Sequence, residues 1–158
     1  MPKIKLLLTG STSQDFIKQG VNEYAKRINR YMNFEMNEVL LPKKIRRLPV
    51  NELKEAEARA VLKYLDDKDL VILLDEKGKR YTSVQFAGFI QKGMLRSYKN
   101  LVFITGGAYG FHNILYNRSN HMISCSDMTF SHQVFRLIFM EQLYRAFTII
   151  HNEPYHHE

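Results

Sequence analysis

The chain has 158 residues, of which 45% are hydrophobic and 25% are charged, a composition typical of a globular domain. This length predicts one domain, spanning residues 1–158, that buries roughly 70% of the surface exposed by the unfolded chain. No apolar run reaches the roughly 18 residues of a membrane-spanning helix, and the opening residues lack a signal-peptide pattern, so we expect no membrane partner.

Charge and cysteine content narrow the setting further. Lysine and arginine number 23 against 16 aspartates and glutamates, a net charge of +7, which favours encounter with polyanions such as nucleic acid. The alternative is an ordinary solvated basic surface. The single cysteine, Cys125, excludes an internal disulfide and is typical of the reducing cytoplasm, where we expect the protein to act.

The first part of the chain predicts two strands around a helix. Residues 3–9 are an apolar run typical of a strand, and residues 10–13 break it with hydroxyl side chains expected to cap a helix. Residues 34–41 predict a second strand, which Pro42 ends because proline cannot donate to a sheet ladder. The helix between them has an apolar face at spacings of three and four, formed by Ile17, Val21, Tyr24, Ile28 and Tyr31.

A basic segment and a second long helix follow. One interpretation of the segment is a loop that contacts phosphates, since such contacts gain affinity by counterion release; the alternative is an ordinary solvated loop. Pro49 opens the helix, with Asn51 expected as its N-cap. The basic residues of the segment are Lys43, Lys44, Arg46 and Arg47.

Residues 70–74 are apolar throughout, which is typical of a strand buried on both faces in a parallel sheet. We expect residues 75–79 to form the loop after it, and Thr82 and Ser83 to cap the next helix. The apolar face of that helix is formed by Phe86, Phe89, Ile90 and Met94.

Residues 101–105 form the next short buried strand, which runs directly into a turn with three glycines in five positions, Gly106 to Gly110. Glycine allows a positive φ and a close approach of backbone or ligand. Open α/β sheets bind ligands at the carboxyl ends of their strands. The turn therefore predicts a ligand site, with a plain strand-to-helix connection as the alternative.

The last part of the chain predicts one or two helical turns over 111–118, a short strand over 121–126 and a long helix over 131–150 capped by Ser131. This helix is apolar around most of its circumference, so it must be buried on most sides. We infer that a second copy of the chain covers one side, in a homodimer. The alternation of strands and helices predicts an α/β fold with a mostly parallel sheet flanked by helices.

Several familiar sites are absent or weakly supported by the residues. The first strand is not followed by the glycine pattern of dinucleotide-binding folds, and the glycine turn lacks the lysine of a phosphate-binding loop. Three histidines cluster only in the polar terminal tail, so no metal is expected. Cys125 and His132 suggest a cysteine hydrolase, although a lone cysteine at a strand end is more typical of a small buried hydrophobe.

The motifs together resemble the RlmH family, bacterial large-subunit ribosomal RNA methyltransferases of the SPOUT class, and the resemblance covers the whole chain. The segments that carry it include the glycine turn 106–110, the loop 124–133, Arg136, residues 141–146 and the tail 152–156. The resemblance implies a C-terminal trefoil knot, which is rare among proteins, and a homodimer. It also implies methyl transfer from S-adenosylmethionine to N3 of a pseudouridine in 23S rRNA of the assembled ribosome.

Site residues follow from the same resemblance by position. The cofactor contacts fall on Leu74, Gly106, Cys125, Ser126, Asp127, Met128, Thr129 and Phe130. The reaction requires alignment of methyl group and acceptor and loss of the N3 proton. His156 is the first candidate base, with Tyr155 placing it; His132 and Arg136 are the second, and Arg136 is alternatively a phosphate contact.

Two positions depart from the family pattern, which has proline where Ser131 stands and a basic residue where His157 stands. The first change affects the rigidity of the cofactor loop, and the second weakens a phosphate contact by the tail. A non-catalytic RNA-binding or ribosome-binding factor on the same fold remains the alternative function. For Glu141 and Arg145 we favour a helix ion pair over a catalytic role.

Overall fold

The computed structural model describes residues 2–157, and its elements alternate as the sequence predicts. In chain order they are β1 (Lys3–Thr9), α1 (Asp15–Ile28), β2 (Phe34–Val39), α2 (Lys43–Arg46), α3 (Val50–Leu62), β3 (Leu70–Arg80), α4 (Ser83–Met94), β4 (Asn100–Thr105), α5 (Asn113–Arg118), β5 (His121–Ser124) and α6 (His132–Ile150).

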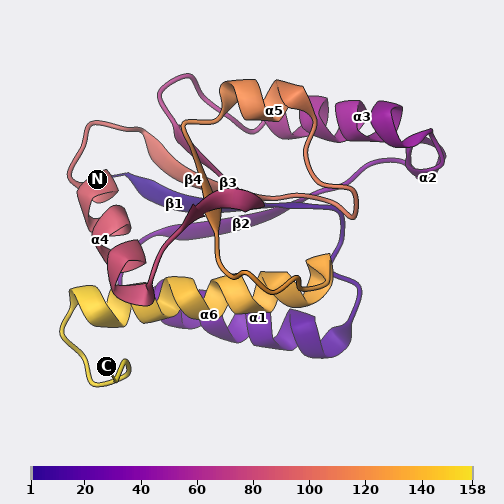
Figure 1. The fold of residues 1–158 in the computed structure, drawn as a ribbon. Coiled ribbons are helices and arrows are strands. Elements are labelled where there is room, and N and C mark those ends of the chain that lie inside the picture. The colour runs from indigo at the N-terminus through magenta and orange to yellow at the C-terminus, as the bar shows by residue number, and fades with distance from the viewer. Residues whose placement is uncertain (1, 158) are drawn as a thin grey trace.

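The strands form one five-stranded sheet in the order β2-β1-β4-β3-β5, and every pairing is parallel. Helices α1, α4 and α6 cover one face, while α3 and α5 cover the other (Figure 1). The expected fold class, a parallel α/β sheet flanked by helices, is confirmed. The knot implied by the resemblance is consistent with this strand order, in which the last strand pairs with β3 rather than with β4.

The core lies on both faces of the sheet because successive strand residues point to opposite sides. In β4, Leu101 and Phe103 pack into the cluster beneath α1, α4 and α6, whereas Val102 and Ile104 pack into the cluster beneath α3 and α5. All six residues of β4 are buried. The prediction that this strand and the start of β3 are buried on both faces is confirmed.

Two expected helix caps are wrong. Gln14, not a hydroxyl residue, is the N-cap of α1, and Asn51 lies inside α3, whose N-cap is Pro49. The hydroxyl of Thr12 instead accepts a hydrogen bond from Arg136. The cap expected at Thr82 is confirmed: its hydroxyl accepts from the N–H of Gln85, whose side chain accepts from the N–H of Thr82.

Two segments expected as loops are regular structure, and one strand is shorter than expected. The basic segment contains the short helix α2, and residues 75–79 belong to β3, which continues to Arg80. The extension forms because Ile123 pairs with both Leu74 and Lys79, across a shift in register. Strand β2 ends at Val39, before the expected boundary.

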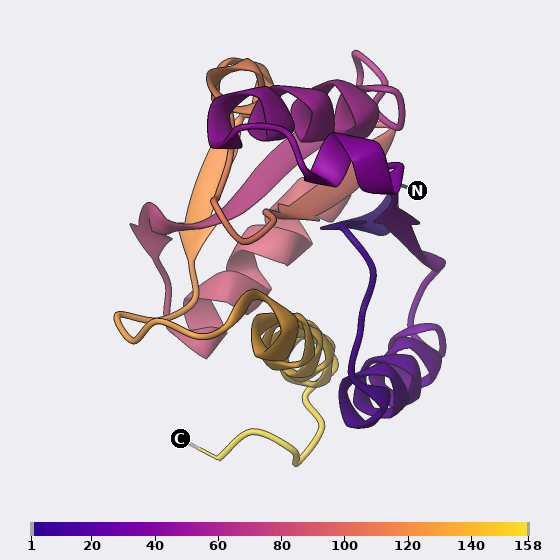
Figure 2. The same ribbon diagram turned by 90° about the vertical axis from the view of Figure 1, so that its right-hand side faces the viewer.

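Helix α6 begins after Ser131, whose hydroxyl accepts from the N–H of Val134 at 3.2 Å, as expected. Every residue from Gln133 to Ile150 is buried or half-buried. Helices α1 and α4 pack along it, and Figure 2 shows α1 and α6 side by side below the sheet. Within residues 2–157, no helix is long and apolar enough to cross a membrane.

Candidate functional site

A cavity of about 400 Å³ opens at the carboxyl ends of β3, β4 and β5. Three segments line it: the end of β3 with Asp75 and Glu76, the glycine turn after β4, and the connection from β5 into α6. The site expected at the glycine turn is therefore a real cavity, placed where parallel sheets bind their ligands.

The glycine turn is held by a hydrogen bond from the N–H of Gly110 to the carbonyl oxygen of Gly107, at 3.2 Å. Gly110 has a φ of +81°, a conformation that L side chains rarely adopt. At Gly106, a Cβ atom would lie 3.4 Å from backbone atoms of Gly110 and from the ring of Phe111. The turn is therefore tight, and its backbone forms part of the cavity wall.

Most of the cofactor residues implied by the resemblance line this cavity. Asp127 does not: its carboxylate pairs with Arg80, and both side chains are largely exposed. Sequence reasoning missed Asp75, Glu76 and Thr105 as wall residues, although each directly adjoins a predicted strand end or the glycine turn. The implied residues on the wall are Leu74, Gly106, Cys125, Ser126, Met128, Thr129 and Phe130.

The ionisable groups of the wall make it acidic. Asp75 and Glu76 are carboxylates, and no lysine or arginine stands among the described residues that line the cavity. Asp75 accepts a hydrogen bond from Tyr116, and desolvation together with this bond raises the pKa of Tyr116 to about 12. A wall with two carboxylates and no cation favours a positively charged ligand.

Two further wall groups are uncharged at neutral pH. Burial raises the pKa of the Cys125 thiol to about 12, so it carries no thiolate with which to act as a nucleophile. Desolvation and the nearby guanidinium of Arg136 lower the pKa of His132. A neutral imidazole has a lone pair that accepts a proton, which suits His132 to the role of a base.

Arg136 lies outside the cavity and is completely buried. Its guanidinium donates to the carbonyl oxygen of Thr9 and to the hydroxyl of Thr12, both at 2.8 Å. Gln133, one turn earlier, bonds the backbone of the same loop at Ser11 and Ser13. Arg136 thus joins the β1–α1 loop to the start of α6, and its burial leaves no surface for a phosphate contact in this structure.

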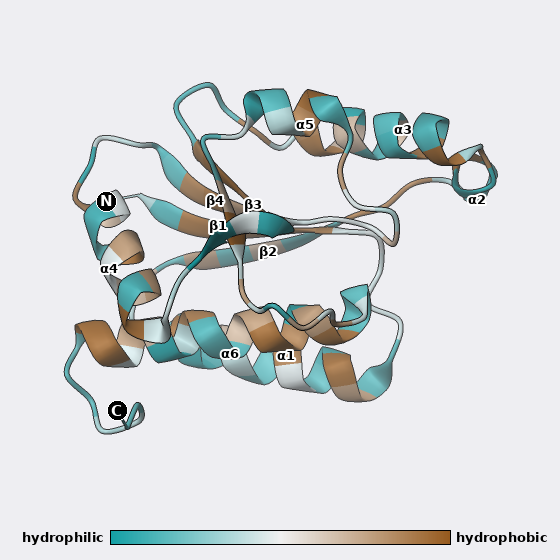
Figure 3. Cartoon of the chain, viewed as in Figure 1, coloured by the Kyte–Doolittle hydropathy of each residue, from teal (hydrophilic) through white to brown (hydrophobic). Residues whose placement is uncertain are grey.

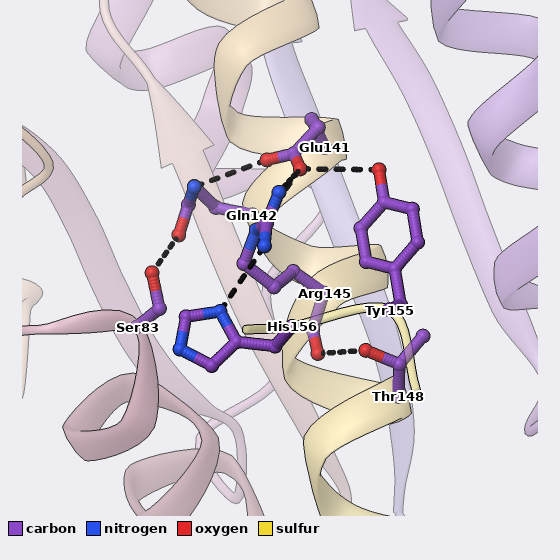
Figure 4. Close-up of polar contacts among 7 residues, drawn as sticks. All are labelled: Ser83, Glu141, Gln142, Arg145, Thr148, Tyr155 and His156. Carbon is purple, nitrogen blue, oxygen red and sulfur yellow. Dashed lines mark hydrogen bonds and ion pairs between the residues drawn. The ribbon is translucent and has the colours of Figure 1, made fainter. Parts of the chain in front are cut away.

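The tail candidates lie far along α6 from the cavity. Tyr155 donates to Glu141 at 3.3 Å, and the guanidinium of Arg145 lies 3.1 Å from Nδ1 of His156 and over the ring of Tyr155 (Figure 4). Neither Tyr155 nor His156 lines the cavity of its own chain. The structure therefore brings together His132 and the cofactor residues, but not the tail.

Glu141 organises the tail contacts. It forms the expected ion pair with Arg145, at 2.5 Å and four residues apart on α6, and it also accepts from Gln142. Gln142 in turn accepts from the hydroxyl of Ser83 at the start of α4 (Figure 4). Tyr155 and His156 are half-buried, whereas the other described tail residues are exposed, so the tail packs lightly, as its polarity predicts.

The basic segment lies at the same edge of the sheet as the cavity, because it follows the carboxyl end of β2 in an all-parallel sheet. We name its four side chains the α2 basic cluster, and all are exposed. Figure 3 shows α2 as mostly hydrophilic, apart from the body of the sheet. The members of the α2 basic cluster are Lys43, Lys44, Arg46 and Arg47.

Comparisons with known proteins agree with this geometry. The family model described as "Predicted SPOUT methyltransferase" matches residues 2–156. A protein named ribosomal RNA large subunit methyltransferase H from Parabacteroides distasonis is 46% identical over 156 residues, covering 99% of both chains. One of the same name from Cytophaga hutchinsonii is 45% identical over 155 residues, covering 98% of this chain and 99% of that one.

Two solved structures share the fold at low sequence identity. A probable methyltransferase from Bordetella pertussis is 12% identical, with a TM-score of 0.57, over 92% of this chain and 94% of that one. A probable methylase family protein from Haemophilus influenzae is 14% identical, with a TM-score of 0.55, over 94% of this chain and 66% of that one.

Proposed function

The chain belongs to the SPOUT methyltransferase family, and we propose that it methylates N3 of a pseudouridine in 23S rRNA with S-adenosylmethionine as donor. Relatives that match over nearly their full length are named for large-subunit ribosomal RNA. The proposed substrate is the assembled ribosome, and the proposed setting is the bacterial cytoplasm, where ribosomes are found. The whole chain, residues 1–158, acts as one domain.

The observation that carries the donor assignment is the charge of the cavity. Asp75 and Glu76 stand on its wall without a neighbouring lysine or arginine among the described lining residues. S-Adenosylmethionine has a positively charged sulfur and an ammonium group, so carboxylates favour it over an anionic ligand. The residues present therefore fit this donor. A cavity of about 400 Å³ is also within the usual range for small-molecule sites.

The protein supplies position and proton transfer. When bound, S-adenosylmethionine supplies an electrophilic methyl group on its sulfur. The glycine turn and the loop from Cys125 to Phe130 hold the donor by backbone groups and apolar walls, and alignment of the reacting atoms is worth about 7–11 kcal/mol. His132 stands at the wall with a lowered pKa, so its neutral ring is available to accept the N3 proton.

Tyr155 and His156 have a different place in the proposed reaction. They lie against α6 rather than at the cavity of their own chain, so proton removal by the tail requires the cavity of a second copy. We propose a homodimer, supported by the half-buried apolar side chains that α6 retains after α1 and α4 have packed on it. Sedimentation equilibrium at micromolar concentration should give the dimer mass, and a monomer would contradict this proposal.

The α2 basic cluster is the proposed contact with RNA phosphates. It is exposed and lies at the same sheet edge as the cavity, so RNA bound there is close to the reaction site. Positive side chains gain affinity for RNA by releasing its counterions. In this arrangement the cluster binds the acceptor while the cavity binds the donor.

The function is tested by incubating ribosomes from a strain that lacks this protein with tritium-labelled S-adenosylmethionine. We expect label in the large-subunit RNA with wild-type protein, and none when the ribosomes come from a strain that has it. If the protein binds S-adenosylhomocysteine without transferring label, the RNA substrate is wrong. If it binds neither the donor nor its product, the non-catalytic RNA-binding factor replaces the enzyme.

A further inference from the structure

Thr105 is the last residue of β4 and lines the cavity directly before the glycine turn. Its side chain is 2% exposed. Among the described residues, no group makes a hydrogen bond with its Oγ1 atom. A buried hydroxyl without a partner is unfavourable, so this one is satisfied only when a polar atom enters the cavity.

The neighbours of Thr105 on the sheet cannot supply that atom. Thr105 is paired with Leu8 of β1 and with Leu74 of β3, and Leu74 is paired with Ile123 of β5. Paired residues of adjacent strands present their side chains on the same face. Thr105, Leu74 and Ile123 therefore form a row at the base of the cavity, with one hydroxyl beside two aliphatic side chains.

This row suits a flat ring with a polar edge. Leu74 and Ile123 offer an apolar surface on which a ring can lie, and the hydroxyl both donates and accepts hydrogen bonds. The cationic groups of the donor are better placed beside Asp75 and Glu76, on another part of the wall. What remains for the row is the adenine base, which has nitrogen acceptors in the ring and an amine donor.

We propose that the Thr105 hydroxyl hydrogen-bonds the adenine base of the methyl donor and so contributes to recognition of the nucleoside. This rests on the proposed function, because it takes S-adenosylmethionine as the ligand of the cavity. The contact adds a side-chain hydrogen bond to a site whose other implied contacts are backbone groups and apolar walls. It also gives the buried hydroxyl its missing partner.

The test is calorimetric titration of S-adenosylhomocysteine into wild type, Thr105→Val and Thr105→Ser. Valine keeps the shape without the hydroxyl, and we expect it to weaken binding about threefold to tenfold. Serine keeps the hydroxyl and should bind within about twofold of wild type. Thr148→Val is the matched control: Thr148 is also buried, but its hydroxyl donates to the carbonyl oxygen of Arg145 in α6, away from the cavity.

A second readout separates ligand contact from a general effect on folding. Without ligand, Thr105→Val should melt at or above the wild-type temperature, because it removes a hydroxyl that lacks a partner. With ligand, its thermal shift should be smaller than that of wild type. A variant that melts lower and binds with unchanged affinity would show a structural role and overturn the proposal.

Analogues identify the part of the ligand involved. Each analogue of S-adenosylhomocysteine lacks one hydrogen-bonding group of the base, either a ring nitrogen or the amine. One analogue should bind wild type more weakly and be insensitive to Thr105→Val. Equal sensitivity of all analogues would place the contact outside the base and overturn the proposal. Unchanged binding by Thr105→Val overturns only this inference, whereas wild type that does not bind S-adenosylhomocysteine overturns the proposed function as well.

Discussion

Gly78 is the residue at which a single methyl group should disturb the cavity most. It lies in β3 where the pairing with β5 shifts register, directly after the segment that carries Asp75 and Glu76. A Cβ atom at this position would lie 2.5 Å from the backbone nitrogen of Ile123 and 2.5 Å from the carbonyl carbon of Met122. These are backbone atoms of a paired strand, which cannot turn aside as a side chain does.

The size of the effect follows from that distance. Ordinary contact begins at 3.4 Å, so the strands must separate by about 0.9 Å to admit alanine. Overpacking of this kind costs about 1–3 kcal/mol, and we expect about 3 kcal/mol because the opposing atoms are backbone. For a domain of this length, about 2–4 °C of melting temperature is lost per kcal/mol. Gly78→Ala should therefore melt about 6–12 °C lower than wild type.

The measurement is thermal unfolding by circular dichroism, followed by titration of S-adenosylhomocysteine below the melting temperature. Binding should weaken, because the displaced segment forms one wall of the cavity. Gly88→Ala is the matched control: it lies in α4, and a Cβ atom there meets nothing within 4 Å. Alanine in a helix gains about 0.5–1 kcal/mol over glycine, so this variant should melt slightly higher. Wild-type stability in Gly78→Ala would refute the reasoning.

Three other predictions concern the cavity, the tail and the basic surface. Cys125→Ala should keep most of its methyl transfer, and wild type should resist alkylation at pH 8, because burial raises the thiol pKa to about 12 and the thiol stays protonated below that pH; loss of turnover would revive the cysteine hydrolase. Deletion of residues 155–158 should abolish transfer and spare S-adenosylhomocysteine binding, while unchanged turnover would remove the tail from the mechanism. Neutralising the α2 basic cluster with glutamines should weaken ribosome binding and flatten its salt dependence by about one unit for each phosphate that the cluster no longer neutralises; an unchanged slope in a filter-binding titration would discard this role for the cluster.

Local pattern predicts the elements well because their apolar periodicity is repeated in the burial. Each apolar run taken as a strand is a strand, and the long final helix begins at its expected cap, Ser131. The failures arise from partners distant in sequence. Thr12 caps no helix because Arg136, 124 residues away, takes its hydroxyl. Residues 75–79 have the composition of a loop, yet Ile123 of β5 pairs with both ends of that segment.

The site was predictable to the extent that it follows the strand ends. The glycine turn and the loop after β5 meet in space because parallel strands end at one edge. The acidic wall also has a signal in the sequence, since Asp75 and Glu76 directly follow a buried run. The placement of the tail is different. Tyr155 and His156 are held by Glu141 and Arg145, and no local pattern indicates that these contacts lie away from the cavity.

The central claim is that this chain methylates N3 of a pseudouridine in large-subunit ribosomal RNA. The most direct measurement is mass spectrometry of nucleosides from 23S rRNA, comparing the source bacterium with a strain from which the gene is deleted. We predict that 3-methylpseudouridine disappears on deletion and returns when the wild-type gene is restored. Persistence of 3-methylpseudouridine at its full level in the deletion strain would contradict the claim.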